Sequence, residues 1–99
     1  MVKLMVLYGK PEDPSAFDDY YAATHVPLAE KIPNLKRYEH GKALSSADGS
    51  EAPYYYVADL SFDDSDALQA ALSSAEGQAA AGDVANFASG GVTMLITEA

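Results

Sequence analysis

The stretch from Val2 to Tyr8 is apolar at nearly every position and ends at Gly9. Because side chains alternate between the two faces of a strand, such a run predicts a strand that is apolar on both faces. The first strand therefore needs cover on both sides.

Residues 92–97 predict a final strand in which two sets of side chains alternate: Val92, Met94 and Ile96 against Thr93, Leu95 and Thr97.

A helix is predicted over residues 14–31. Asp13-Pro14-Ser15 offers a capping side chain followed by a proline at the first helical position. An apolar stripe recurs at helical spacing through Phe17, Tyr20, Tyr21, Thr24, His25 and Leu28. Pro27 lacks the N–H that a helix interior requires, so we expect the helix to kink or restart beside His25.

The middle of the chain predicts two strands joined by a hairpin, and then a second helical region. The strands span residues 35–43 and 54–62, with turn chemistry at Ala47-Asp48-Gly49-Ser50. The expected core face of the second strand is formed by Tyr54, Tyr56, Ala58, Leu60 and Phe62. Asp63-Asp64-Ser65 can cap the helical region, which continues towards Val84 and Phe87 and ends at Gly90-Gly91.

The order strand, helix, strand, strand, helix, strand predicts a single α+β domain over residues 1–99 with ferredoxin-like topology. Right-handed crossovers would give a four-stranded antiparallel sheet with both helical regions on one face. The open face would then carry Met5, Leu7, Tyr55, Val57 and Leu95. An apolar patch of this extent is unusual on a monomer, so we expect a homodimer in which two sheets cover each other.

Composition excludes several kinds of partner and chemistry. A net charge of −9 would repel the phosphates of nucleic acids and anionic membrane surfaces. The absence of cysteine removes disulfides, thiolate metal sites and thiol nucleophiles. No apolar stretch reaches the roughly 20 residues of a membrane span, so we expect a cytoplasmic protein. Two distant histidines give no metal-ligand pattern, and few basic residues are available for haem propionates, so we expect no metal or cofactor.

Several segments together resemble the EthD family of dimeric α+β barrels. In the first half they are Phe17-Asp18-Asp19-Tyr20-Tyr21, Thr24-His25-Val26-Pro27-Leu28 and Pro33-Asn34-Leu35-Lys36-Arg37-Tyr38, and in the second half Ser74-Ala75-Glu76-Gly77-Gln78 with Asp83 and Asn86-Phe87. The resemblance covers essentially the whole chain and implies a dimeric barrel with a ligand pocket between the sheet and the first helix, with His25 at its edge. The wider superfamily includes monooxygenases, lactone isomerases, polyketide cyclases and haem-handling proteins, so the fold alone does not name a reaction.

His25 is the first candidate for catalysis. It lies four residues after Tyr21 and three before Leu28, so helical geometry turns it towards the apolar stripe. Spacing alone favours a core histidine bonded to a backbone carbonyl, such as one released by Pro27. With the family resemblance added, we favour a general acid or base, since imidazole titrates near neutrality.

Tyr38 and His40 lie two apart on a strand and share a face, so they could present a phenol and an imidazole to one cavity. Position alone favours a half-buried packing role for Tyr38 and a solvent-facing edge position for His40. We keep Tyr38 as a second catalytic candidate that could donate to a developing enolate. The candidate ligand contacts are Tyr8, Tyr21, His40 and Tyr56.

Asp59 lies between Ala58 and Leu60 in the predicted central strand. An unpaired carboxylate there would be costly. We therefore expect Asp59 to pair with Arg37 or Lys3, or to contact the partner subunit, and we favour this structural role over catalysis.

Three hypotheses for function follow. The first is a cofactor-free enzyme acting on a small, mainly apolar carbonyl compound by isomerisation, cyclisation or a monooxygenase-type oxidation, with His25 moving a proton. The second is a non-catalytic protein that binds a hydrophobic metabolite or supports an oxidative enzyme. The third is a homodimer whose pocket is filled by its own tyrosines, which the lack of a cavity near His25 would indicate.

Overall fold

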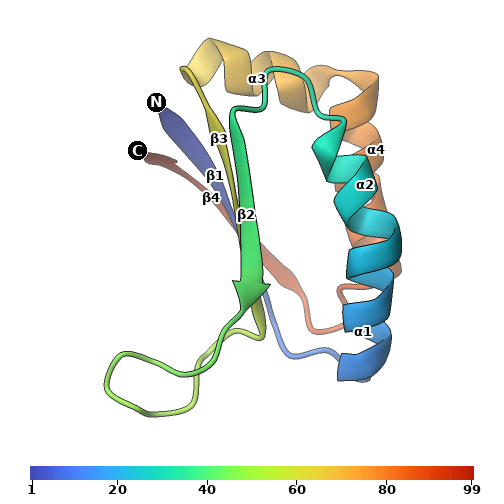
Figure 1. Cartoon of the computed structure of the whole chain (residues 1–99), viewed down its shortest axis with the longest axis vertical. Helices are drawn as coiled ribbons and strands as arrows, with labels where there is room; N and C mark the ends of the chain where they lie inside the picture. Colours follow the sequence, from blue (N-terminus) through green and yellow to red (C-terminus); the bar gives the residue numbers. More distant parts are fainter.

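The computed structural model describes residues 1–99 and confirms the predicted α+β architecture (Figure 1). The elements are β1 (Val2–Tyr8), α1 (Pro14–Tyr20), the π-helical turn η1 (Tyr21–His25), α2 (Val26–Glu30), β2 (Arg37–Lys42), β3 (Tyr56–Phe62), α3 (Ser65–Ser73), α4 (Ala75–Asp83), the 3₁₀ turn η2 (Val84–Asn86) and β4 (Val92–Glu98). The strands form one antiparallel sheet in the order β2-β3-β1-β4, and the helices cover one of its faces. None of the helices has the length and apolarity needed to cross a membrane.

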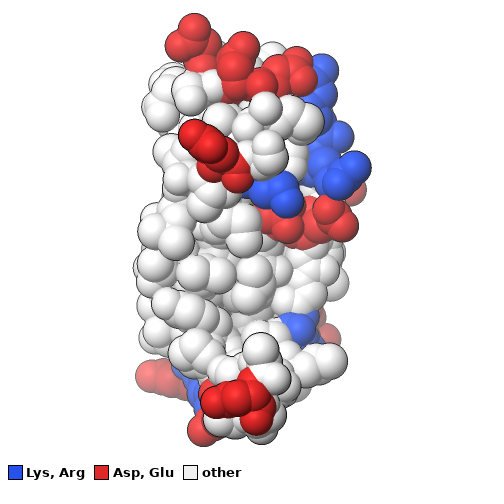
Figure 2. All heavy atoms as spheres, turned by 90° about the vertical axis from the view of Figure 1, so that its left-hand side faces the viewer, with Lys and Arg blue, Asp and Glu red and all other residues white.

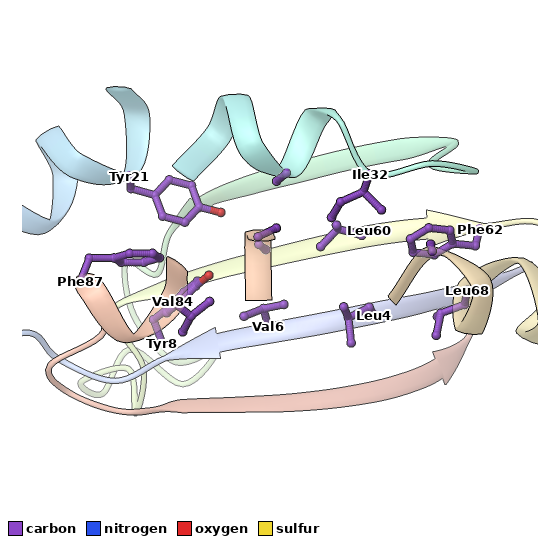
Figure 3. Packing of buried hydrophobic residues seen from close by; sticks show 14 of the residues in the cluster. Leu4, Val6, Tyr8, Tyr21, Ile32, Leu60, Phe62, Leu68, Val84 and Phe87 are labelled. Atoms are coloured by element: carbon purple, nitrogen blue, oxygen red, sulfur yellow. The ribbon is translucent and has the colours of Figure 1, made fainter. Parts of the chain in front are cut away.

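The hydrophobic core lies between the sheet and the helices (Figure 3). The register places Leu4 opposite Leu60 and Val6 opposite Ala58, so β1 and β3 direct these side chains to the same face. The buried hydrophobic residues are Leu4, Val6, Tyr8, Phe17, Tyr21, Ala29, Ile32, Ala58, Leu60, Phe62, Leu68, Ala71, Ala80, Val84 and Phe87. Burial of Ala58, Leu60 and Phe62 confirms these three positions of the predicted core face, whereas Tyr56 is half-buried and Tyr54 lies before the strand.

The first helical segment contains the interruption that Pro27 predicts. Asp13 caps its start by accepting a hydrogen bond from the Ala16 N–H at 3.2 Å. The chain then widens into the π-helical turn η1, where the Val26 N–H bonds to the Tyr21 carbonyl, and α2 begins with Pro27 near its start. Tyr21 and His25, at the two ends of this turn, are both buried.

The segment before β3 differs from the prediction. Regular pairing begins at Tyr56 rather than Tyr54, so the two-residue alternation does not extend back to Tyr55. The Tyr55 hydroxyl instead donates to Asp18 at 2.7 Å, and its ring packs edge-on against Phe17. The placement of Tyr55 on the open face was therefore wrong, because a carboxylate and an aromatic ring on α1 draw it to the helical side.

The face of the sheet away from the helices carries a broad uncharged belt, with charged side chains gathered towards its ends (Figure 2). Met5, Leu7 and Val57 are only half-buried there, and Leu95 is 51% exposed. The edge strand β4 is exposed along its length. This surface has the character predicted for a face that another molecule covers.

Asp59 also lies on the open face, and one of its carboxylate oxygens, Oδ1, is enclosed without a hydrogen-bond partner. Arg37 pairs instead with Glu39, at 3.6 Å. No ion pair joins Asp59 to Lys3. The predicted pairing of Asp59 within the chain was therefore wrong, and its contact with a partner subunit stays a prediction.

The junction of α3 and α4 offers a test of this packing. The Ser74 hydroxyl donates to the Ala71 carbonyl at 2.6 Å and accepts from the Gly77 N–H at 2.9 Å, which folds the chain tightly. A Cβ at Gly77 would clash with the Ala71 carbonyl oxygen, whereas a Cβ at Gly82 on the same helix would meet open space.

We therefore expect opposite effects from two alanine substitutions. Gly77→Ala should lower the free energy of unfolding by about 1 to 3 kcal/mol because the backbone must shift. Gly82→Ala should raise it by about 0.5 to 1 kcal/mol because alanine favours a helix. Urea denaturation of both variants measures the difference, and equal effects would contradict the close approach at Gly77.

Candidate functional site

A cavity of about 60 Å³ lies between the sheet and the helices. Its aliphatic wall includes Leu4, Leu60, Ile32 and Leu72, and its polar groups come from Tyr8, Tyr21, His25 and Tyr38. Met94 and Ala81, which also line it, are exposed at the surface, so the cavity opens between β4 and α4. A cavity beside His25 argues against the third hypothesis, in which the tyrosines fill the pocket.

The size of the cavity limits what it can enclose. One water molecule needs about 10 to 15 Å³, and an engineered apolar cavity of about 150 Å³ admits benzene. The present volume lies between these values. It suits a compound of roughly four to six non-hydrogen atoms, or the end of a longer one that extends through the opening.

His25 is held by a buried carboxylate. Its Nδ1 lies 3.0 Å from Oδ2 of Asp83, and the two residues are only 6% and 8% exposed. The other oxygen of Asp83 accepts hydrogen bonds from the Tyr20 hydroxyl at 2.6 Å and from the Asn86 amide at 3.0 Å. Asp83 therefore joins α1, η1 and the end of α4, and it fixes the direction of the imidazole.

The surroundings set the charge of this pair. Burial raises the pKa of Asp83, but the hydrogen bonds from Tyr20, Asn86 and His25 outweigh it and hold this pKa below its usual range. Burial lowers the pKa of His25, and Asp83 offsets only part of that effect. At neutral pH the carboxylate is ionised and the imidazole is neutral. Since an ionised carboxylate only accepts, Nδ1 carries the proton and Nε2 is left as a base.

Three phenols surround the cavity near His25. The hydroxyls of Tyr21 and Tyr38 lie 2.6 Å apart, so one donates to the other. Burial raises the pKa of Tyr38 to about 12 and raises the pKa values of Tyr21 and Tyr8 further. All three phenols stay protonated near neutral pH and can act as hydrogen-bond donors.

Two of the sequence candidates do not line the cavity. His40 is exposed on β2, and its Nδ1 lies 2.7 Å from the Tyr56 hydroxyl. Tyr56 packs against the ring of Tyr21, with centroids 4.5 Å apart, and so supports the cavity wall from outside. The structure thus brings His25, Tyr38, Tyr8 and Tyr21 together on the cavity, and leaves His40 and Tyr56 beside it.

Sequence reasoning missed the role of Asp83. Spacing alone favoured a backbone carbonyl as the partner of His25, and that expectation was wrong, because a carboxylate 58 positions away takes its place. The only signal in the sequence was the presence of Asp83 and Asn86 in the segment that resembles the EthD family. Their convergence on His25 depends on how α4 packs beside α2. No three His, Asp or Glu side chains are grouped so that they could hold a metal ion.

Comparison with known proteins decides the family. The EthD domain model matches residues 10–91. The chain belongs to the EthD family. A Rhodococcus erythropolis relative, described as an uncharacterized 11.0 kDa protein in the thcB-thcC intergenic region, is 48% identical over 99% of this chain and 94% of its own length. The crystal structure of an EthD family protein from Bacillus halodurans matches with a TM-score of 0.92 at 38% identity, covering 100% of this chain and 98% of that one.

More distant structures share the fold of this EthD protein. A dimeric ferredoxin-like protein from Jannaschia matches with a TM-score of 0.70 at 27% identity, covering 100% of both chains. Hydroxynitrile lyase from Passiflora edulis matches at 0.76 and 18% identity, covering 96% and 89% of the two chains. The cofactor-independent oxygenase SnoaB from Streptomyces nogalater matches at 0.66 and 20%, covering 99% and 91%.

The pair of His25 and Asp83 predicts a specific titration. We expect NMR of the His25 ring to give a pKa below the ordinary 6.5, because burial outweighs the carboxylate. Asp83→Asn should lower this pKa further, since it removes the charge that favours the imidazolium. Asp19→Asn, at an exposed carboxylate on α1, is the matched control and should leave it unchanged.

The lowered pKa of His25 also makes the stability of the fold depend on pH. Below about pH 7 the unfolded chain takes up a proton at residue 25 before the folded chain does, so the free energy of unfolding should fall as the pH drops towards the folded pKa. His25→Gln should remove this part of the pH dependence. A His25 pKa above 6.5, or one insensitive to Asp83→Asn, would contradict the assignment.

Proposed function

We propose that this EthD family protein is a cofactor-independent enzyme that moves a proton on a small, uncharged, mainly apolar carbonyl compound, with His25 as the general base. The observation that carries this proposal is the hydrogen bond of 3.0 Å between His25 and Asp83 at the wall of an apolar cavity. A neutral imidazole with its second nitrogen free is the form that accepts a proton at neutral pH.

Asp83 supports the reaction through His25. As Nε2 takes a proton, the imidazole becomes positively charged, and the ionised carboxylate at Nδ1 stabilises that charge. Tyr20 and Asn86 keep the carboxylate oriented and below its ordinary pKa. Because this pair is enclosed, its electrostatic interaction is stronger than it would be in water.

The lining of the cavity favours an uncharged substrate. It contains no lysine or arginine, and the ionised Asp83 lies directly behind His25. A carboxylate or phosphate would lose its hydration there without gaining a cation. A carbonyl group requires only hydrogen-bond donors, and the phenols of Tyr21 and Tyr38 supply them.

The structural relatives support an enzyme without naming its reaction. One protein of the same fold is a cofactor-independent oxygenase and another is a hydroxynitrile lyase. Both are less than 25% identical to this chain, so the likeness concerns the fold alone. Isomerisation, cyclisation and a monooxygenase-type oxidation would all begin with the removal of a proton by His25.

The second candidate is a protein that binds a hydrophobic metabolite, or supports an oxidative enzyme, without converting the ligand. The observation that favours it is the dominance of aliphatic side chains in the cavity wall. The two candidates differ in one respect: only the enzyme needs His25 to exchange a proton with the ligand.

A homodimer completes the proposal. The uncharged belt on the open face (Figure 2) and the enclosed oxygen of Asp59 both favour a second copy of the chain at this surface. The similar proteins from Jannaschia and from Thermobifida fusca are dimeric and ferredoxin-like. Pairing through this face would leave the helices and the His25 cavity of each protomer on the outside.

Exchange of substrate protons tests the role of His25. Small ketones and aldehydes in D₂O should exchange their α-protons in the presence of the protein, as followed by NMR. His25→Gln should slow this exchange by about a hundredfold or more, because the base is gone. Thr24→Ala, at an exposed neighbour on the same turn, should leave the rate unchanged. Undiminished exchange by a folded His25→Gln protein would refute the role, and saturable binding without exchange would favour the second candidate.

Light scattering at micromolar concentration tests the dimer. The wild-type chain should have twice the mass of one protomer. Leu95→Glu should shift it towards the monomer, because a charge on the open face would be buried between the two sheets. Gln69→Glu adds the same charge on the exposed side of α3 and should leave the dimer intact. A monomeric wild-type protein would contradict the inference that a second copy of the chain covers the open face.

A further inference from the structure

The hydroxyl of Tyr8 is the polar group of the cavity that the proposed function leaves without a role. Tyr8 is only 1% exposed and lines the cavity, and its hydroxyl forms no hydrogen bond of ordinary geometry within the chain. Burial raises the pKa of Tyr8, and hydrogen bonding from the nearby Tyr21 hydroxyl offsets only part of that rise. The Tyr8 oxygen is not enclosed as Asp59 Oδ1 is, so it borders the open space of the cavity, and a polar group that faces an otherwise apolar cavity calls for an explanation.

The position of Tyr8 supplies that explanation. In Figure 3 the hydroxyl oxygens of Tyr8 and Tyr21 point from opposite walls, one from β1 and one from the π-helical turn, into the space between sheet and helices. The Tyr21–Tyr38 pair has two hydroxyl protons, and only one is used between them. Together the three phenols therefore offer two free donors at one end of the cavity. Leu4, Leu60 and Ile32 lie towards the other end.

We propose that Tyr8 and the Tyr21–Tyr38 pair form an oxygen-binding site, and that the ligand is a short aliphatic ketone or aldehyde. The carbonyl oxygen lies against the phenols, and the alkyl part lies against the aliphatic wall. The volume of about 60 Å³ limits the enclosed part to roughly four to six non-hydrogen atoms. This inference rests on the proposed function, and it adds the substrate class and a catalytic role for Tyr8.

The chemistry balances without any added reagent. His25 Nε2 takes a proton from the carbon next to the carbonyl, and the electron pair of that C–H bond becomes a C=C bond. The π pair of the carbonyl moves onto oxygen, where Tyr8 and the free proton of the tyrosine pair donate to the negative charge. The proton then returns from His25 to carbon. Since burial raises the pKa values of the phenols, they donate hydrogen bonds and keep their protons.

Two ligands of matched shape test the oxygen site. 2-Butanone and 2-methyl-1-butene have equal numbers of non-hydrogen atoms, but only the ketone carries an oxygen. Titration of each at millimolar concentration, followed by protein NMR, should show saturable binding of both. Tyr8→Phe should weaken 2-butanone binding about five- to fiftyfold and change hydrocarbon binding less than twofold, since it removes one buried donor. Tyr54→Phe, at a phenol outside the cavity, is the matched control and should change neither.

Urea denaturation of the same variants separates function from folding. Tyr8→Phe should leave the stability of the free protein unchanged or raised, because its hydroxyl forms no hydrogen bond of ordinary geometry. Tyr21→Phe should lower stability, because it removes the 2.6 Å bond to Tyr38. A clear loss of stability in Tyr8→Phe would show that its hydroxyl serves the fold and would overturn the inference.

The outcomes also separate this inference from the proposed function. If Tyr8→Phe weakens ketone binding while His25→Gln leaves α-proton exchange unchanged, the oxygen-binding role of Tyr8 is supported and the assignment of His25 as the base is wrong. If His25→Gln abolishes exchange while Tyr8→Phe binds the ketone as tightly as the wild type does, the assignment of His25 as the base is supported and the oxygen-binding role of Tyr8 is wrong. Absence of saturable 2-butanone binding to the wild-type protein would overturn the substrate class.

Discussion

The hydrogen bonding of the buried Asp83 carboxylate is the interaction on which the rest of the site depends. A lone carboxylate in this position would be strongly destabilising, because it loses its hydration. Three donors from separate elements replace that hydration: Tyr20 from α1, His25 from η1 and Asn86 from η2. The same bonds therefore align the two helical segments and fix the orientation of the imidazole. A substitution of Asp83 would therefore disturb both the packing of the helices and the orientation of His25.

The π-helical turn shows how the local sequence prepares this arrangement. Pro27 cannot donate a helical hydrogen bond, and the turn before it widens so that Val26 bonds to Tyr21. Both ends of the turn face the sheet, which brings the imidazole of His25 and the phenol of Tyr21 to one cavity. Such turns occur often at functional sites because they place side chains where a regular helix would not.

Much of this fold could be predicted from the sequence, since strands and helices follow from periodicity and from capping residues such as Asp13. The interruption at Pro27 and the core face of β3 were predicted for the same reason. Contacts between distant elements could not be, because periodicity describes one element at a time. Asp83 was missed for that reason, and Tyr55 was misplaced because a partner on α1 overrode the local alternation. Tyr8 was predicted as a ligand contact, but the position of its hydroxyl at the cavity appears only in three dimensions.

In the proposed function, the two ends of the cavity bind different parts of the ligand, the reactive group at one end and the remainder at the other. Its polar end is built from groups that hold each other in place, the carboxylate with His25 and the phenol of Tyr21 with Tyr38. Its other end is aliphatic, and substitutions there would change its volume without breaking a hydrogen bond. Under this proposal the chain could therefore change its ligand by repacking leucines while keeping His25 as its base.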